Sequence, residues 1–288
     1  LHVRSRRQRQ MCIRDRLKKE SMQILKEKSR AKSQITFDED FNVPDAKPDA
    51  GRLIQNKGRI IMDDVRLTDG KGILTGNLQV DILYVGEERG IVSSLTAKLP
   101  FEETLNLKDI INGDKMCLKW EIEDLTIRLI HSRKLNIKAL VTFCATVDET
   151  EQIRLPVALD AEEVSVRKKT VRFLGLTVHK KDTLRIKDEY TIASNRPDIA
   201  SLIWYTMDVR GLDLKPEENV VKARGELSVF VLYGAEDTEA PVQWLEYSLP
   251  FSGEVECPDC TEELIPLIEA SVMHQSLELS LIHISEPT

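Results

Sequence analysis

An internal tandem duplication constrains the fold of this chain more than any other feature. Several short patches recur further along the chain, and self-similarity at a fixed spacing is the signature of repeated structural units. Three patches recur at an offset of 149 residues: Pro48-Asp49 with Pro197-Asp198, Leu53-Ile54 with Leu202-Ile203, and Gly76–Tyr84 with Gly225–Tyr233. Leu99-Pro100-Phe101 recurs as Leu249-Pro250-Phe251 at an offset of 150. We therefore expect two copies of one module, with a single residue inserted in the second.

Alternation of apolar and polar residues predicts that the module is built from β-strands. The stretches 78–84 and 135–143 alternate with period two, which is typical of strands with one buried face. The phase of this alternation changes at Glu123-Asp124, which predicts a β-bulge. We read Asp69-Gly70, Gly86-Glu87-Glu88 and Leu99-Pro100-Phe101 as turns. The expected class is mainly β, with two tandem antiparallel sandwich-like or partial-barrel domains.

The Pro-Asp patch predicts one short helix in each copy. Pro48 and Pro197 suit the first turn of a helix, where a missing N–H costs nothing. The aspartates that follow would face the positive end of the helix dipole. Leu53-Ile54 and Leu202-Ile203 would supply the apolar side of each helix, and Gly58 would end the first one.

The two ends of the chain read as sequencing-library adapter rather than as protein. Residues 6–16 (RRQRQMCIRDR) and 279–288 (LSLIHISEPT) are translations of the two arms of a transposase-type adapter, so we exclude such segments from fold reasoning. The expected organisation is 1–16 adapter artefact, 17–32 N-terminal lead-in, 33–150 first domain, 151–180 charged connector with a strand or two, 181–278 second domain, and 279–288 adapter artefact.

The repeat offset also says where the second copy stops. Residue 278 corresponds to about residue 128 of the first copy, so the second copy should lack the counterpart of Ser132–Val147. Loss of a core strand leaves an unpaired edge and an exposed apolar face. We therefore expect the second domain to be truncated and marginally stable.

Composition narrows the possible partners. Without the two ends, 35 basic and 46 acidic residues remain, a formal charge of −11 instead of −7. An acidic chain is a poor match for nucleic acid or an anionic membrane surface, each of which needs a basic face. No stretch reaches the eighteen or so apolar residues of a membrane-spanning helix. The four remaining cysteines, Cys117, Cys144, Cys257 and Cys260, fit a reducing compartment.

Residues that could carry chemistry are present but not in catalytic patterns. Cys257-Pro258-Asp259-Cys260 is a lone CxxC, which we interpret as structural, with a zinc site shared with other ligands and a redox role as alternatives. The histidines, His131, His179 and His274, are dispersed. Asp38-Glu39-Asp40 and Asp63-Asp64 lack the pattern of a calcium loop, and Gly70-Lys71-Gly72 lacks that of a phosphate loop. We expect no catalytic, cofactor-binding or metal-binding residues and no enzyme activity.

Four patches of the first copy together resemble the SPOCS domain family. They are Asp40–Asp49 (DFNVPDAKPD), Gly76–Tyr84, Leu99-Pro100-Phe101 and Ser132–Ala139 (SRKLNIKA). The second copy departs from the pattern, keeping only Asn195-Arg196-Pro197-Asp198 of the first patch and ending before the last. Domains of this family occur in tandem in clostridial-type spore-formers, usually ahead of a LysM module, of which this chain has no sequence.

The resemblance implies a function in spore-coat assembly. It implies a non-catalytic structural protein on the cytoplasmic, mother-cell side of the forming spore, with other spore-coat morphogenetic proteins as partners and without a cofactor. It implies neither nucleic-acid binding nor membrane insertion, and glycan binding only through the LysM module.

Two alternatives from other functional classes stay open. One is an envelope polysaccharide-binding module, which would need solvent-facing aromatic side chains; only Trp120, Trp204 and Trp244 are tryptophans, and we expect Trp120 to lie in the core. The other is a hydrolase that uses a pair of convergent Asp or Glu carboxylates.

Overall fold

The structure is a computed structural model that describes residues 17–278 except 89, 112–113, 115, 160–166, 168, 171–174, 194, 236–240, 271 and 273–274. Both segments expected to be adapter lie outside the described residues, as do most of the apolar residues expected to add strands in the connector. The described residues form nine strands in three antiparallel sheets. They contain no helix, and therefore no helix that could cross a membrane. The expected mainly-β class is confirmed.

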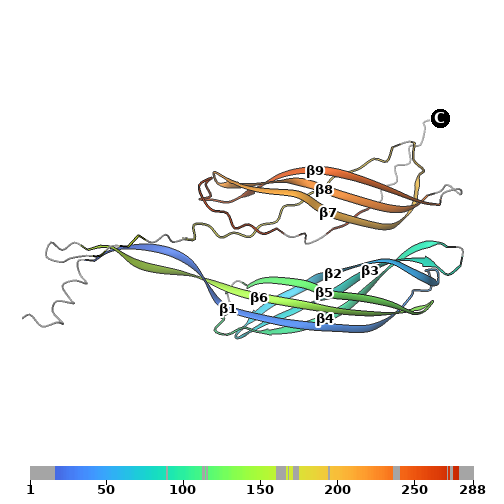
Figure 1. Ribbon diagram of the computed structural model, residues 1–288, viewed down its shortest axis with the longest axis horizontal. Helices are drawn as coiled ribbons and strands as arrows, with labels where there is room; N and C mark the ends of the chain where they lie inside the picture. The colour runs from blue at the N-terminus through green and yellow to red at the C-terminus, as the bar shows by residue number, and fades with distance from the viewer. Residues whose placement is uncertain are drawn as a thin grey trace, which may run out of the picture.

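The first copy folds as a sandwich of two three-stranded sheets (Figure 1). One sheet has the order β1–β6–β5, with β1 at Leu17–Asn42, β6 at Lys134–Leu159 and β5 at Met116–His131. The other has the order β2–β3–β4, with β2 at Ala50–Thr68, β3 at Lys71–Gly86 and β4 at Val92–Asn106. The outer halves of β1 and β6 pair with each other beyond the end of β5 and form a two-stranded arm.

The core of the sandwich comes mainly from its two central strands. Every second residue of β3 and of residues 134–147 of β6 is buried, as their alternation predicts, because these parts of the central strands have one face against the opposite sheet. Phe143 of β6 and Phe101 of β4 meet across the sandwich with ring centroids 5.2 Å apart. Seven apolar side chains of β6 are buried: Leu135, Ile137, Ala139, Val141, Phe143, Ala145 and Val147.

The second copy repeats only one of these sheets. Strands β7 (Ile199–Glu217), β8 (Val220–Ala235) and β9 (Val242–Glu256) form a sheet of order β7–β8–β9. The bounds of β7 and β8 are those of β2 and β3 shifted by 149 residues, and those of β9 are β4 shifted by 150. The structure thus reproduces the tandem duplication, and the inserted residue lies between β8 and β9.

The segments that correspond to β1 and β5 carry no strand in the second copy. They run through the described residues of 175–193 and 264–278, and they include the alternating run Thr183–Ile186. In the first copy both β1 and β5 hydrogen-bond to β6, and the repeat offset puts the counterpart of β6 at about residue 284. That position lies outside the described residues, and among the described residues neither segment pairs with a strand. The second core is correspondingly small and separate from the first.

The expected short helix is wrong in both copies. Residues 44–47 form a turn, with Lys47 N–H donating to Pro44 O at 2.9 Å, and β2 begins directly after Asp49. Leu53 then pairs with Tyr84 of β3, and Leu202 pairs with Tyr233 of β8 in the same way. The ladder to a central strand overrides the local helix signal, since it pairs the backbone groups on the side of the segment that faces that strand.

Gly58 also has a different role from the helix end we expected. It lies in the middle of β2, where an added Cβ would come within 2.9 Å of Leu125 Cδ2 on β5. The glycine therefore permits close contact between the two sheets.

Leu99-Pro100-Phe101 is likewise not a turn. The three residues lie in the middle of β4, and Leu249-Pro250-Phe251 lies in the middle of β9. Both strands are sheet edges, where proline is tolerated because its missing N–H can face away from the ladder. Two other local predictions are confirmed: Asp69-Gly70 joins β2 to β3 with Gly70 at φ 78°, and the pairing of β5 shifts between Ile122 and Asp124.

Candidate functional site

Two of the four motif patches meet around the guanidinium of Arg133 at one end of the first sandwich, and Tyr84 of a third patch contacts the same loop. This residue lies in the turn between β5 and β6. Its Nη1 donates to the carbonyl of Lys47 at 2.8 Å and to Asp49 Oδ1 at 3.0 Å. Its Nη2 donates to the carbonyl of Val43 and to Asp45 Oδ1, both at 3.0 Å. One side chain therefore donates hydrogen bonds to four acceptors of the loop that carries the Pro-Asp patch.

Backbone and tyrosine contacts complete this connection. Val43 N–H donates to Arg133 O at 2.9 Å, and Ala50 N–H donates to Ser132 O at 2.8 Å. The buried Tyr84 hydroxyl donates to Pro48 O at 2.9 Å, and burial raises the pKa of Tyr84. We call this assembly the Arg133 latch; it consists of Val43, Asp45, Lys47, Pro48, Asp49, Tyr84, Ser132 and Arg133. Sequence reasoning grouped these residues as motif patches but did not predict that they touch.

A charged ladder continues from the latch along the outer face of β1 and β6. Lys134 Nζ pairs with Asp40 Oδ2 and Lys138 Nζ with Asp38 Oδ2, each at 2.8 Å. Asn136 Nδ2 donates to both carboxylates at 3.0 Å. The hydrogen bond from Lys138 lowers the pKa of Asp38, and that from Lys134 lowers the pKa of Asp40. Both carboxyl groups are therefore ionised at neutral pH and are not proton donors for general acid catalysis.

The second copy has the tyrosine of the latch but not its hydrogen bond. Tyr233 corresponds to Tyr84 and is fully buried, yet its hydroxyl has no partner among the described residues. Arg196, beside the second Pro-Asp patch, donates instead from Nη1 to Trp244 O at 2.7 Å. A residue in the position of Arg133 would come near residue 283, outside the described residues.

The two CxxC cysteines occupy a turn that the first copy builds from apolar residues. Cys257 N–H donates to Asn219 O, Cys260 N–H donates to Cys257 O, and Asp259 has φ 66°. By the offset of 150, Cys257 and Cys260 stand where the first copy has Leu107 and Ile110, both buried, with Asp109 at φ 58° between them.

Burial, followed by the neighbouring Cys257, raises the pKa of Cys260, so this thiol is protonated at neutral pH. Within the part of the chain that the structure describes, no three potential metal ligands cluster. The repeat places the two cysteines where the first copy has core residues, and the structural interpretation of the CxxC turn stays a prediction.

The remaining candidate residues are the histidines and the aspartates of the acidic runs, and those that the structure describes lie at separate places. His131 ends β5, and its Nδ1 accepts from Arg133 N–H at 3.3 Å; His179 lies outside any strand, and His274 lies outside the described residues. Asp63 Oδ2 accepts from Asn77 Nδ2 at 2.7 Å, and Asp64 pairs with Arg66. Among the described residues, His131, His179 and the acidic runs are thus not shown to share a site.

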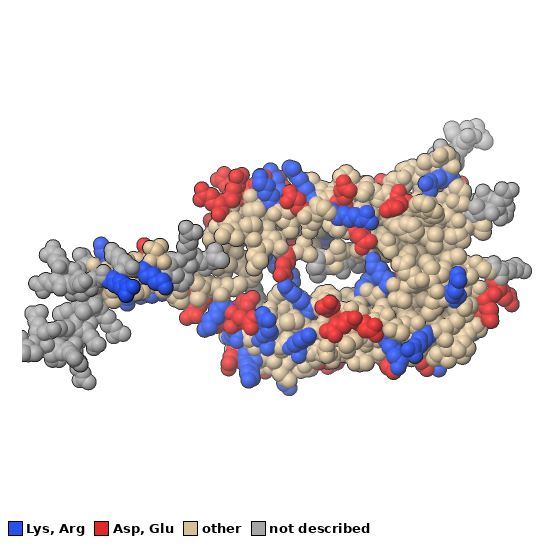
Figure 2. Space-filling model, viewed as in Figure 1, with Lys and Arg blue, Asp and Glu red and all other residues tan. Residues whose placement is uncertain are grey.

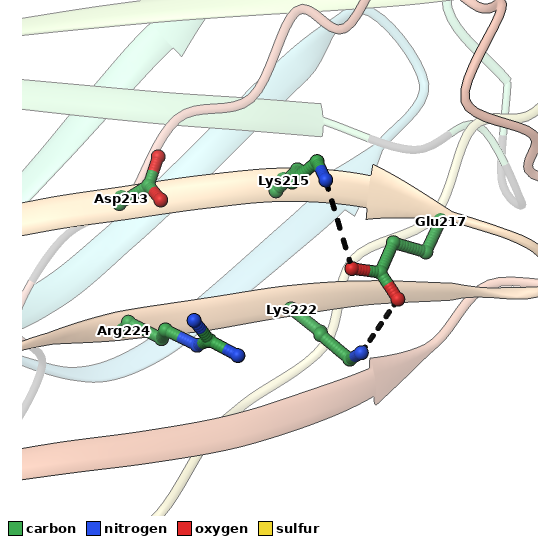
Figure 3. A pocket seen from close by; sticks show the side chains of 5 residues that line it. All are labelled: Asp213, Lys215, Glu217, Lys222 and Arg224. Atoms are coloured by element: carbon green, nitrogen blue, oxygen red, sulfur yellow. Dashed lines mark ion pairs between the residues drawn. The ribbon is translucent and has the colours of Figure 1, made fainter.

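The surface depressions are shallow and charged. One lies on the outer face of β7 and β8 (Figure 3), where Glu217 pairs with Lys222 at 2.6 Å and with Lys215 at 4.0 Å. The hydrogen bond from Lys222 lowers the pKa of Glu217, which again leaves an ionised, paired carboxylate. A second depression lies between the units, where Arg59 pairs with Asp81 at 2.7 Å opposite Trp204. Basic and acidic side chains alternate over the visible face of the molecule (Figure 2).

Two of the three tryptophans face solvent. Trp120 is 41% exposed, so its expected core position is wrong. It lies on β5, which is an edge strand of its sheet, so no neighbouring strand covers its outer side. Trp244 is 56% exposed and stacks on Phe230 with ring centroids 6.2 Å apart and planes at 23°. Trp204 is buried.

Comparison with known families gives one match. The family described as "SipL, SPOCS domain" matches residues 49–130 and again residues 198–280, which together make up more than half of the chain. The two matched regions begin at the two Pro-Asp patches, in agreement with the repeat. Neither a curated protein nor a solved structure matches the chain.

Proposed function

Because the chain belongs to the SipL, SPOCS domain family, we propose that it is a non-catalytic structural protein of spore coat or spore envelope assembly. In this proposal its tandem β units hold other spore-coat morphogenetic proteins on the mother-cell side of the forming spore. The family assignment supports the sporulation-related part of this role, whereas the coat partners are our inference.

The observation that carries the proposal is how the motif residues are used. Arg133 donates to four acceptors of its own chain, and the carboxylates of Asp38 and Asp40 are neutralised by their own lysines. In this proposal these residues stabilise the fold and are not the acid and base that a carboxylate hydrolase requires. A duplicated unit offers two surfaces to one assembly, so the second contact gains effective concentration.

A sporulating host tests this role directly. In-frame deletion of the codons for residues 17–278, with the rest of the gene kept, should leave coat material detached from the forespore in electron micrographs. An allele with the exposed substitution Lys138→Ala, which leaves the latch intact, is the matched control and should attach its coat. Normal coats in the deletion strain, with the shortened protein present at its usual level, would contradict the proposal.

A second candidate is favoured by the exposed aromatic stack on the outer face of the second sheet. Trp244 on Phe230 presents a flat, partly exposed apolar surface, as a sugar-stacking site would. If the chain binds envelope polysaccharide, it should co-sediment with purified spore peptidoglycan, and Trp244→Ala should abolish this while Trp120→Ala does not. A wild-type chain that stays in the supernatant rules this candidate out.

A further inference from the structure

We propose that the cleft between the two units binds one small organic carboxylate, which Lys57 and Arg59 hold against the indole of Trp204. The cleft lies where β7 contacts the first unit, and its volume is about 260 Å³. Its lining includes Lys57, Arg59, Asp81 and Thr96 of the first unit and Trp204 of the second, and we call it the inter-unit cleft. Sites for small molecules often lie between domains and start at about 300 Å³, so this cleft suits a small ligand. The proposal is independent of the function proposed above.

The wall of the cleft on the first unit has cations with unused hydrogen-bond donors. Lys57 is half-buried, and its ammonium has no ion pair or hydrogen bond among the described residues. Arg59 donates from Nη2 to Asp81 Oδ2 at 2.7 Å, whereas its buried Nε has no partner in the described part of the chain. A buried donor without an acceptor is unfavourable, so an additional acceptor oxygen at Arg59 would be stabilising.

Asp81 positions the guanidinium of Arg59 and sets the net charge of this wall. Its Oδ1 accepts from Thr96 Oγ1 at 2.7 Å and from Gln79 Nε2 at 3.1 Å, while its Oδ2 accepts from Arg59. The carboxylate is therefore held by three donors of its own chain. Two cations and one carboxylate leave a single positive charge, which matches a ligand with one negative charge, such as a monocarboxylate.

The wall on the second unit is apolar. Trp204 lies on β7, which is the strand of the second sheet nearest the first unit in Figure 1, and only 6% of its surface is exposed. A few charged groups facing an apolar or aromatic wall are typical of sites that bind small organic molecules. The tryptophan therefore favours a carboxylate carried on a flat apolar body over inorganic phosphate.

The repeat shows that the fold of the unit does not require these side chains. Each residue of the cleft differs from its counterpart at the offset of 149, whereas core residues such as Val80 and Tyr84 recur as Val229 and Tyr233. Both copies nevertheless form the same pair of hairpins. The charged and aromatic residues are thus present only on the walls that face the cleft. The differing pairs are Lys57 and Thr206, Arg59 and Asp208, Asp81 and Phe230, and Gln55 and Trp204.

The test titrates the full chain with benzoate and follows backbone amide shifts by NMR. Benzoate should give saturable, single-site shifts on both walls, at residues 57–59 and 79–81 and at residues 203–205. Benzamide has the same ring without the charge, and acetate has the charge without the ring. Each should need at least about tenfold more ligand for half-saturation, because each lacks one of the two interactions of the site. Inorganic phosphate should also bind at least about tenfold more weakly than benzoate.

Two substitutions that insert the residue of the other copy test the walls one at a time. Lys57→Thr should raise the benzoate concentration for half-saturation by about tenfold or more, whereas Lys57→Arg should not. Trp204→Gln should weaken benzoate and leave acetate unchanged. Lys98→Ala is the matched control, because Lys98 is exposed on β4 and does not line the cleft.

Amide spectra of the variants away from the cleft should match those of the parent chain, which shows that the variants are folded. The proposal is overturned if benzoate gives no saturable shifts or if the shifts lie outside the cleft. It is also overturned if benzamide or phosphate binds as tightly as benzoate, or if Lys57→Thr has no more effect than Lys98→Ala.

Discussion

Among the polar side chains of the first unit, we expect that of Arg133 to contribute most to stability. It donates to two loop carbonyls and two carboxylates while its side chain is only 30% exposed. Arg133→Ala removes four hydrogen bonds, of which the two to the carbonyls of Lys47 and Val43 are part-buried, so the free energy of unfolding should fall by about 2–3 kcal/mol. Urea denaturation followed through exchange of the β3 amides measures this. Lys138→Ala, an exposed ion-pair control, should cost less than about 1 kcal/mol; equal costs would contradict the special position of Arg133.

The two equivalent tyrosines should respond oppositely to loss of their hydroxyl. Tyr84→Phe removes a buried hydrogen bond to Pro48 O and should destabilise the first unit by about 1 kcal/mol. Tyr233→Phe removes a buried hydroxyl that has no partner among the described residues, so the second unit should be unchanged or more stable. Amide exchange in β3 and in β8 reports the two units separately. A destabilising Tyr233→Phe would mean that this hydroxyl has a partner.

The lysine–aspartate ladder predicts sensitivity to acid. The pKa values of Asp38 and Asp40 are lowered in the folded state from the ordinary value of 3.8. A lowered pKa contributes stability that is present above the unfolded-state value and is lost as the pH falls through the folded-state value. The urea midpoint of the first unit should therefore drop below about pH 4. Asp38→Asn with Asp40→Asn should flatten this dependence, whereas Glu39→Gln should not.

At the scale of an element, the equivalent turn of the first copy indicates the role of the CxxC turn in the second. Because Cys257 and Cys260 replace Leu107 and Ile110, the double substitution Cys257→Leu, Cys260→Ile should leave the stability of the second unit unchanged or raise it. A metal chelator should not shift its melting temperature. The reciprocal change, Leu107→Cys with Ile110→Cys, should destabilise the first unit because it shrinks two buried side chains. A chelator-induced fall in melting temperature would instead indicate a metal site.

At the scale of the whole molecule, the two units should differ greatly in stability. The seven buried β6 side chains contribute on the order of 10 kcal/mol to the first unit, at about 1.5–3 kcal/mol for each large one. This is comparable with the entire net stability of a typical domain. Limited proteolysis should therefore cut within 175–193 and 264–278 before it cuts any strand of the first sandwich. Mass spectrometry of early fragments measures the order, and early cuts in β5 or β6 would contradict it.

The sequence by itself determined the features that depend on local pattern. The offsets of 149 and 150 predicted that the second copy repeats the strands of the first, and β7, β8 and β9 stand at these offsets from β2, β3 and β4. Period-two alternation identified the buried faces of β3 and β6, and its phase change located the bulge after Ile122. The helix at the Pro-Asp patch and the turn at Pro100 were wrong because both are local preferences that strand pairing overrides.

Only the tertiary structure decided which distant residues act together. Arg133 lies 84 residues from Asp49, and β1 pairs with β6 across most of the first unit, so neither contact has a local signal. The same holds for the second unit: the residues of 175–193 have the composition of a strand, but they lack a pairing partner among the described residues. A strand is stable only when another strand satisfies its backbone groups, and that partner is set by the fold as a whole rather than by neighbouring sequence.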